Sequence, residues 1–80
     1  MDHKRVGRRI KAFRKLKGYT QVKLAKELNF PLAKLGSVER GRMEAPSFLL
    51  TQIANLLEID EEEITLENMS IKEDTNFSNR

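Results

Sequence analysis

The chain has 80 residues, no cysteine and a formal net charge of +3, so it can form one small domain whose core no disulfide supports. It contains no apolar run long enough to span a membrane, one histidine (His3) and no glycine-rich phosphate loop. We therefore expect a soluble cytoplasmic protein that is not an enzyme and needs no cofactor or metal.

Positive charge is concentrated in the first half of the chain. Residues 1–42 contain thirteen Lys and Arg against three acids, a balance of +10, whereas residues 43–80 contain two basic residues against nine acids, a balance of −7. The sum recovers +3. A basic segment of this size is typical of a domain that binds a polyanion such as nucleic acid, although a solvated lysine-rich surface would give the same count.

The first predicted helix spans residues 3–17. Its apolar residues recur at spacings of four, three and three, which indicates one face of an amphipathic helix. These residues are Val6, Ile10, Phe13 and Leu16. Gly18 stands where a C-terminal cap is expected.

Two further helices are predicted in the basic half. Thr20 is a good N-cap for a helix over residues 21–28, and Asn29 suits the left-handed turn that would follow it. Pro31 is tolerated at a helix start, so the third helix is expected over residues 31–40.

The second half predicts two helices and a polar end. A fourth helix is expected over residues 48–58, with Ser47 as its N-cap. Asp60 and Glu63 have the capping-box spacing for a short fifth helix. We interpret residues 67–80 as a polar, disordered tail.

Five short helices joined by short connections predict an all-α fold, a compact five-helix bundle formed by residues 1–66. The expected core consists of apolar residues on the inner faces of these helices. They are Val6, Ile10, Phe13, Leu24, Ala25, Leu28, Phe30, Leu35, Val38, Leu49, Ile53, Leu56 and Ile64.

The segment TQVKLAKEL, residues 20–28, is followed at fixed spacing by Leu35, Val38 and the run Glu39-Arg40-Gly41. This pattern resembles the Cro/XRE-type helix-turn-helix of phage repressors, and the resemblance extends over about residues 5–65. It implies a lambda-repressor-like fold with a helix-turn-helix. It also implies a sequence-specific DNA-binding transcriptional regulator, most simply a repressor, whose third helix enters the major groove of double-stranded DNA.

The resemblance also implies roles for individual residues. Thr20 and Gln21 begin the second helix, where Gln21 would donate its amide to a phosphate and brace the third helix. Arg14 and Glu39 match a partly buried structural ion pair. The other positions implied to contact DNA are Leu32, Ala33, Lys34, Ser37, Arg40 and Arg42. Of these, the three cations would lie against phosphates.

The third helix departs from the family in its outward surface, which is expected to consist of Leu32, Ala33, Gly36, Ser37 and Arg40. Leu32 and Ala33 offer bases only apolar contact, for instance with a thymine methyl group. One interpretation is a DNA-binding regulator with modest direct readout. The alternative is a helix-turn-helix module that binds protein, an anti-repressor or an antitoxin-like partner with little or no DNA readout. The basic half of the chain favours DNA.

A domain of this size is expected to bind as a homodimer, with half-sites about one DNA turn apart. The candidate interface lies on the fourth and fifth helices, with Leu57, Leu66 and Met69 as anchors. The alternative for Leu57 is that it completes the core.

Overall fold

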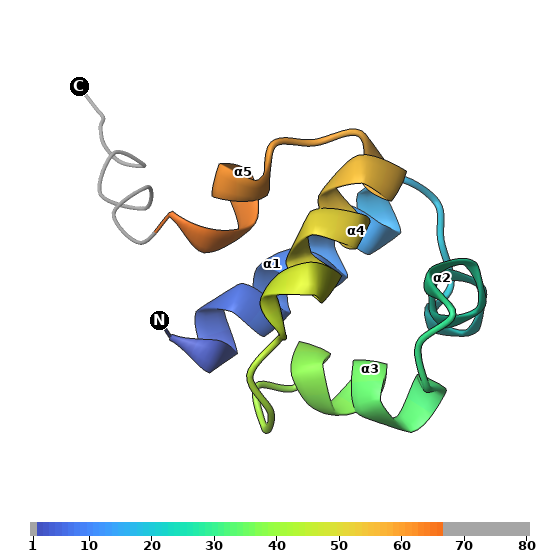
Figure 1. Cartoon of the computed structure of the whole chain (residues 1–80), viewed down its shortest axis with the longest axis horizontal. Coiled ribbons are helices and arrows are strands. Elements are labelled where there is room, and N and C mark those ends of the chain that lie inside the picture. The colour runs from blue at the N-terminus through green and yellow to red at the C-terminus, as the bar shows by residue number, and fades with distance from the viewer. Residues whose placement is uncertain (1, 67–80) are drawn as a thin grey trace.

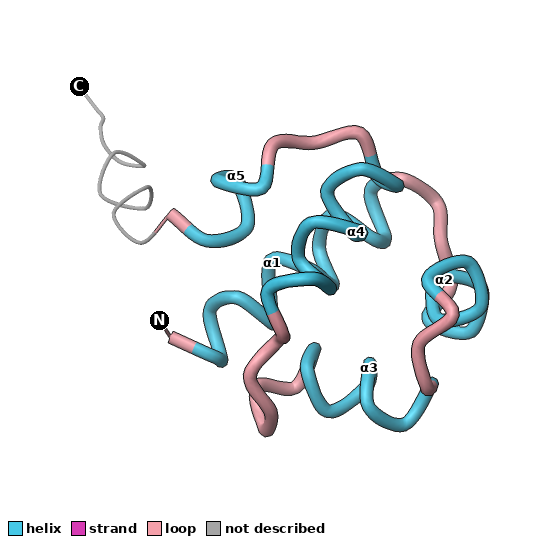
Figure 2. Tube along the Cα trace, viewed as in Figure 1, coloured by secondary structure: helices cyan, strands magenta, loops and turns pink. Residues whose placement is uncertain are grey.

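The computed structural model describes residues 2–66, and these residues form five helices and no strand (Figures 1 and 2). The helices are α1 (His3–Leu16), α2 (Gln21–Leu28), α3 (Leu32–Glu39), α4 (Ser47–Leu57) and α5 (Glu61–Thr65). The predicted all-α, five-helix fold is confirmed. The tail expected over residues 67–80 lies outside the described residues, as does the proposed anchor Met69. No helix within residues 2–66 is long and apolar enough to cross a membrane.

Helix α1 begins with a cap that the sequence analysis did not identify. The Asp2 carboxylate accepts hydrogen bonds from the backbone N–H groups of Lys4 (3.0 Å) and Arg5 (3.2 Å). These bonds, with that from Arg5 the stronger cause, hold the pKa of Asp2 below its ordinary value. At the other end, Gly18 adopts a left-handed conformation (φ +83°), as its predicted role as a cap requires.

The turn between α2 and α3 has the predicted conformation. The Thr20 hydroxyl accepts a hydrogen bond from the Lys23 N–H (3.0 Å) and so caps α2. Asn29 is left-handed (φ 53°), which reverses the chain direction before α3. Pro31 stands just before that helix, at its N-cap position.

The predicted start of α4 is wrong by one residue. Pro46, not Ser47, occupies the N-cap position, and its carbonyl accepts hydrogen bonds from the N–H groups of Leu49 (2.9 Å) and Leu50 (3.2 Å). Ser47 already has helical backbone and makes no capping bond. At α5, the capping-box positions are as predicted, because the Asp60 N–H donates to the Glu63 carboxylate (3.3 Å).

The core is formed by the inner faces of all five helices. Most predicted core residues are buried, but three of them only partly: Phe13, Phe30 and Leu56. Four residues with apolar side chains outside that list are also buried: Ala45, Leu50, Ala54 and Leu57, the last of which had a place in the core as its alternative prediction. Leu57 is 1% exposed, so it completes the core and cannot anchor a dimer.

Leu16 is not part of the inner face of α1, contrary to the prediction, and is 74% exposed. Leu16 follows Ile10 by two steps of three residues. Each step is shorter than the 3.6 residues of a helical turn, so Leu16 lies about 120° around the helix from Ile10. Arg14 takes the inward position in the last turn instead, where it is 6% exposed.

Helices α1 and α3 cross at a contact that only glycine allows. A Cβ atom built on Gly7 would lie 2.2 Å from the carbonyl oxygen of Val38 and 2.7 Å from that of Glu39. The backbone of α1 therefore rests directly on the C-terminal turn of α3. This contact fixes the position of α3 relative to the rest of the bundle.

Candidate nucleic-acid interface

A buried ion pair fixes the helix-turn-helix against α1. Arg14 donates from Nε to Glu39 Oε2 (2.8 Å) and from Nη2 to Glu39 Oε1 (3.1 Å), a bidentate geometry. A third bond from Arg14 Nη1 to the carbonyl of Tyr19 (2.8 Å) holds the loop before α2. The structure thus brings Arg14 and Glu39 together as the resemblance implied.

Gln21 joins this pair and so braces α3, as the resemblance implied, although its partner was not named there. Its Nε2 donates to Glu39 Oε1 (3.0 Å), so one carboxylate connects the first three helices. The side-chain amide has a second N–H donor, which makes no hydrogen bond within residues 2–66. Gln21 is half-buried at the first position of α2, next to Thr20.

The outer surface of α3 differs from the expected one at Gly36. Leu32, Ala33 and Lys34 are exposed and Ser37 is half-buried, but Gly36 is buried. The residue is covered because the side chains of Arg40 and Gln21 lie over it. The prediction that Gly36 belongs to the open surface is therefore wrong.

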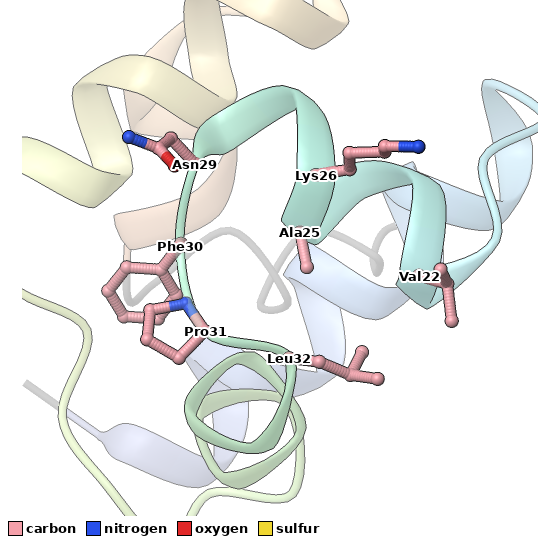
Figure 3. Close-up of a pocket in the computed structure, with 7 residues that line it drawn as sticks. All are labelled: Val22, Ala25, Lys26, Asn29, Phe30, Pro31 and Leu32. Carbon is pink, nitrogen blue, oxygen red and sulfur yellow. The ribbon is translucent and has the colours of Figure 1, made fainter.

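A shallow depression lies beside this surface, between α2 and α3 (Figure 3). It has a volume of about 530 Å³ and is lined by Val22, Ala25, Lys26, Asn29, Phe30, Pro31 and Leu32. Val22 and Leu32 are 61% and 44% exposed, and they extend toward the same side of the turn (Figure 3). Val22 was not identified from the sequence, because an exposed apolar residue on a surface helix gives no periodic signal.

Exposed cations lie on α3, just after it and on α2. Lys34, Arg40 and Arg42 are exposed, and so are Lys23 and Lys26 on the neighbouring helix α2. Residues 43–66 contain six acids and no Lys or Arg. Four of these acids are the run from Asp60 to Glu63 at α5, which lies at the far end of the bundle from α2 (Figure 1). Residues 2–66 hold no group of acidic or histidine side chains placed to bind a metal ion.

Sequence comparison identifies relatives that are regulators. The chain is 45% identical over 58 residues to an uncharacterized HTH-type transcriptional regulator of Bacillus subtilis, YazB, and the match covers 72% of this chain and 84% of the relative. It is 39% identical over 69 residues to the immunity repressor protein of Bacillus phage phi105. That match covers 86% of this chain but 48% of the repressor, so the chain spans about half the length of that relative.

Structure comparison identifies a controller protein with a similar fold. The crystal structure of the restriction-modification controller protein C.AhdI from Aeromonas hydrophila superposes with a TM-score of 0.74 at 28% sequence identity, over 79% of this chain and 96% of that chain.

The sequence profile of the helix-turn-helix family matches residues 10–64. The chain therefore belongs to the Cro/XRE-type helix-turn-helix family, and it is a DNA-binding transcriptional regulator rather than an enzyme.

Proposed function

We propose that the protein is a repressor that places α3 in the major groove of double-stranded DNA. The observation that carries this proposal is the exposed surface of α3, with small or apolar side chains in its first turn and cations around it. Small side chains let a helix approach base edges closely, and the cations can neutralise phosphates on both sides of the groove. The likeness to a phage immunity repressor supports repression over activation.

Each DNA-binding residue has a proposed role. Leu32 and Ala33 contact thymine methyl groups, and Ser37 bonds to a base edge with little discrimination. Lys34 and Arg42 contact phosphates, which position the domain without reading sequence.

At the start of α2, Thr20 and Gln21 approach the phosphate backbone, where the helix N-terminus favours an anion. The Thr20 hydroxyl already accepts a capping bond, but its own O–H can still donate. The remaining donor of the Gln21 amide is available in the same way. Arg40 completes the set of DNA-binding residues.

We also propose that the protein acts as a homodimer. Two copies would read two half-sites about one DNA turn apart, and this doubles the contacts that one small domain can make. Leu66 is 44% exposed just after α5, where it can contribute to an interface between copies. A regulator that binds bacterial or phage DNA acts in the cytoplasm, which is the location we infer.

The substitution Ala33→Glu tests whether α3 enters the groove. Ala33 is exposed, so the variant should fold normally, but its carboxylate would face the phosphates and base acceptors. We expect binding to duplex DNA, measured by fluorescence anisotropy, to fall at least tenfold. The control is Ala12→Glu, which adds the same charge at an exposed alanine of α1 and should change affinity far less.

The same pair of variants separates DNA binding from the alternative of a protein-binding module. If both variants bind duplex DNA as the unmodified protein does, α3 does not enter the groove. If the unmodified protein fails to bind any duplex even in dilute buffer, the surface of α3 and the depression beside it would instead be a contact for another protein.

A further inference from the structure

We propose that Arg40 recognises a guanine base in the major groove, and that Gly36 provides the space from which it does so. This inference rests on the proposed function, because it assumes that α3 enters the groove. It revises the role that the resemblance implied for Arg40, which was contact with a phosphate. The evidence is the position of the Arg40 guanidinium along α3.

The guanidinium of Arg40 lies one helical turn back along α3, over the backbone of Gly36. A Cβ atom built on Gly36 would lie 3.0 Å from Nη1 and 3.7 Å from Cζ of Arg40. The side chain therefore folds toward the N-terminus of the helix, which is the direction that helical side chains prefer. Because Arg40 as a whole is exposed, its guanidinium remains open to a ligand.

The side chain of Gln21 borders the same space in a fixed orientation. Its Nε2 is held by Glu39 (3.0 Å), and its Oε1 lies 3.6 Å from the Cβ position built on Gly36. An amide oxygen only accepts hydrogen bonds and carries partial negative charge. It therefore favours a cation at this level of the helix, beside the small-side-chain surface of α3.

The chemistry of the position suits guanine. Guanine presents two acceptors, N7 and O6, in the major groove, and the planar fork of an arginine can bond to both at once. Leu32 and Ala33 have no polar side-chain atoms with which to read a base. Lys34 lies about 160° around the helix from Gly36, so it cannot reach the same base edges as Arg40.

Glycine at residue 36 leaves free the space that the Arg40 guanidinium occupies. Among residues other than proline, glycine is the least favourable inside a helix, and Gly36 has an ordinary helical conformation, without the positive φ that would call for glycine. An alanine methyl group would crowd Nη1 of Arg40, so the guanidinium would have to shift from this position. A contact with a phosphate beyond the end of α3 would need no such space.

The experiment is a selection of binding sites from a random duplex library, made with the unmodified protein and with the variants Arg40→Ala, Gly36→Ala and Arg42→Ala. We expect the unmodified protein to prefer guanine at one position of each half-site by about 5- to 150-fold, as one bidentate contact typically discriminates. Both Arg40→Ala and Gly36→Ala should lose the preference for guanine at that position and keep the preferences at all other positions. Arg42→Ala, the control for a phosphate contact, should weaken binding uniformly and keep every preference.

Several results would overturn the inference. If Arg40→Ala weakens binding to all duplexes equally, lowers the salt dependence by about one counterion and keeps every base preference, Arg40 contacts a phosphate. If Gly36→Ala keeps the guanine preference while remaining folded by circular dichroism, the space at Gly36 is not needed. If the unmodified protein binds no duplex at all, the proposed function itself fails, and this outcome is distinct from the other two.

Discussion

At the scale of single residues, the buried pair of Arg14 and Glu39 has the largest predicted effect on stability. Replacing Arg14 by Met leaves the Glu39 carboxylate buried, with the Gln21 amide as its remaining donor. Removing one partner of a buried pair typically costs about 3–5 kcal/mol. We therefore expect Arg14→Met to lower the free energy of unfolding, measured by urea denaturation, by an amount of this order.

Two further variants make that prediction specific. The double variant Arg14→Met/Glu39→Leu removes both charges and should recover much of the loss, because an apolar pair often replaces a buried ion pair without penalty. Lys23→Ala breaks the exposed pair between Lys23 and Glu27 (3.7 Å), which should cost less than about 0.5 kcal/mol. A loss in Arg14→Met no larger than that of Lys23→Ala would show that the buried pair does not stabilise the fold.

At the scale of the helices, the crossing of α1 and α3 distinguishes two glycines that the sequence treats alike. Helix propensity alone predicts that alanine would stabilise either helix by about 1 kcal/mol. The structure predicts opposite outcomes. At Gly7 the methyl group would lie 2.2 Å from a backbone carbonyl, whereas at Gly36 it would meet only the mobile end of Arg40.

We therefore expect Gly7→Ala to reduce the free energy of unfolding by about 1–3 kcal/mol, as overpacking typically does, and so to lower the melting temperature. Gly36→Ala should leave the melting temperature unchanged or raise it. Thermal unfolding followed by circular dichroism measures both. Equal stabilisation by the two substitutions would mean that α1 does not rest on the end of α3.

The same two glycines illustrate which features of the structure could be predicted from the sequence and which could not. Helix positions, the left-handed turn at Asn29 and most of the core follow from local spacing and capping, because these depend on neighbours along the chain. The burial of Gly36 and the close contact at Gly7 depend on side chains and helices distant in sequence. A glycine carries no signal of what covers it, and so the outer surface of α3 was only partly predictable.

At the scale of the whole molecule, charge is distributed unevenly over the helices, although the acidic α5 packs against the basic α1. Residues 1–42 have a balance of +10, and they include all of α1, α2 and α3. Residues 43–66 contain six acids and no cation, four of which lie at α5, away from α2 (Figure 1). A duplex would attract the cations of α2 and α3 more strongly than the end of the bundle that holds α5, so long-range attraction favours an approach with α3 toward DNA before any contact forms.

The proposed phosphate contacts predict how binding depends on salt. Each phosphate that the protein neutralises releases counterions, so the logarithm of the binding constant should fall linearly with the logarithm of the salt concentration, by about 0.9 per contact. Lys34→Ala and Arg42→Ala should each reduce that slope by about 1, because each removes one proposed phosphate contact. The measurement is a salt titration of binding to random duplex DNA, run beside sedimentation to fix the number of copies bound.

A matched variant separates contact from general attraction. Arg8→Ala removes one exposed cation from α1 and changes the net charge by the same amount as Lys34→Ala. General attraction is screened over about 10 Å at 0.1 M salt, so from that salt concentration upward Arg8→Ala should reduce the slope by much less than 1. Equal slopes for Arg8→Ala and the other two variants would mean that Lys34 and Arg42 act only through the overall charge, and that the phosphates lie against another part of the basic end.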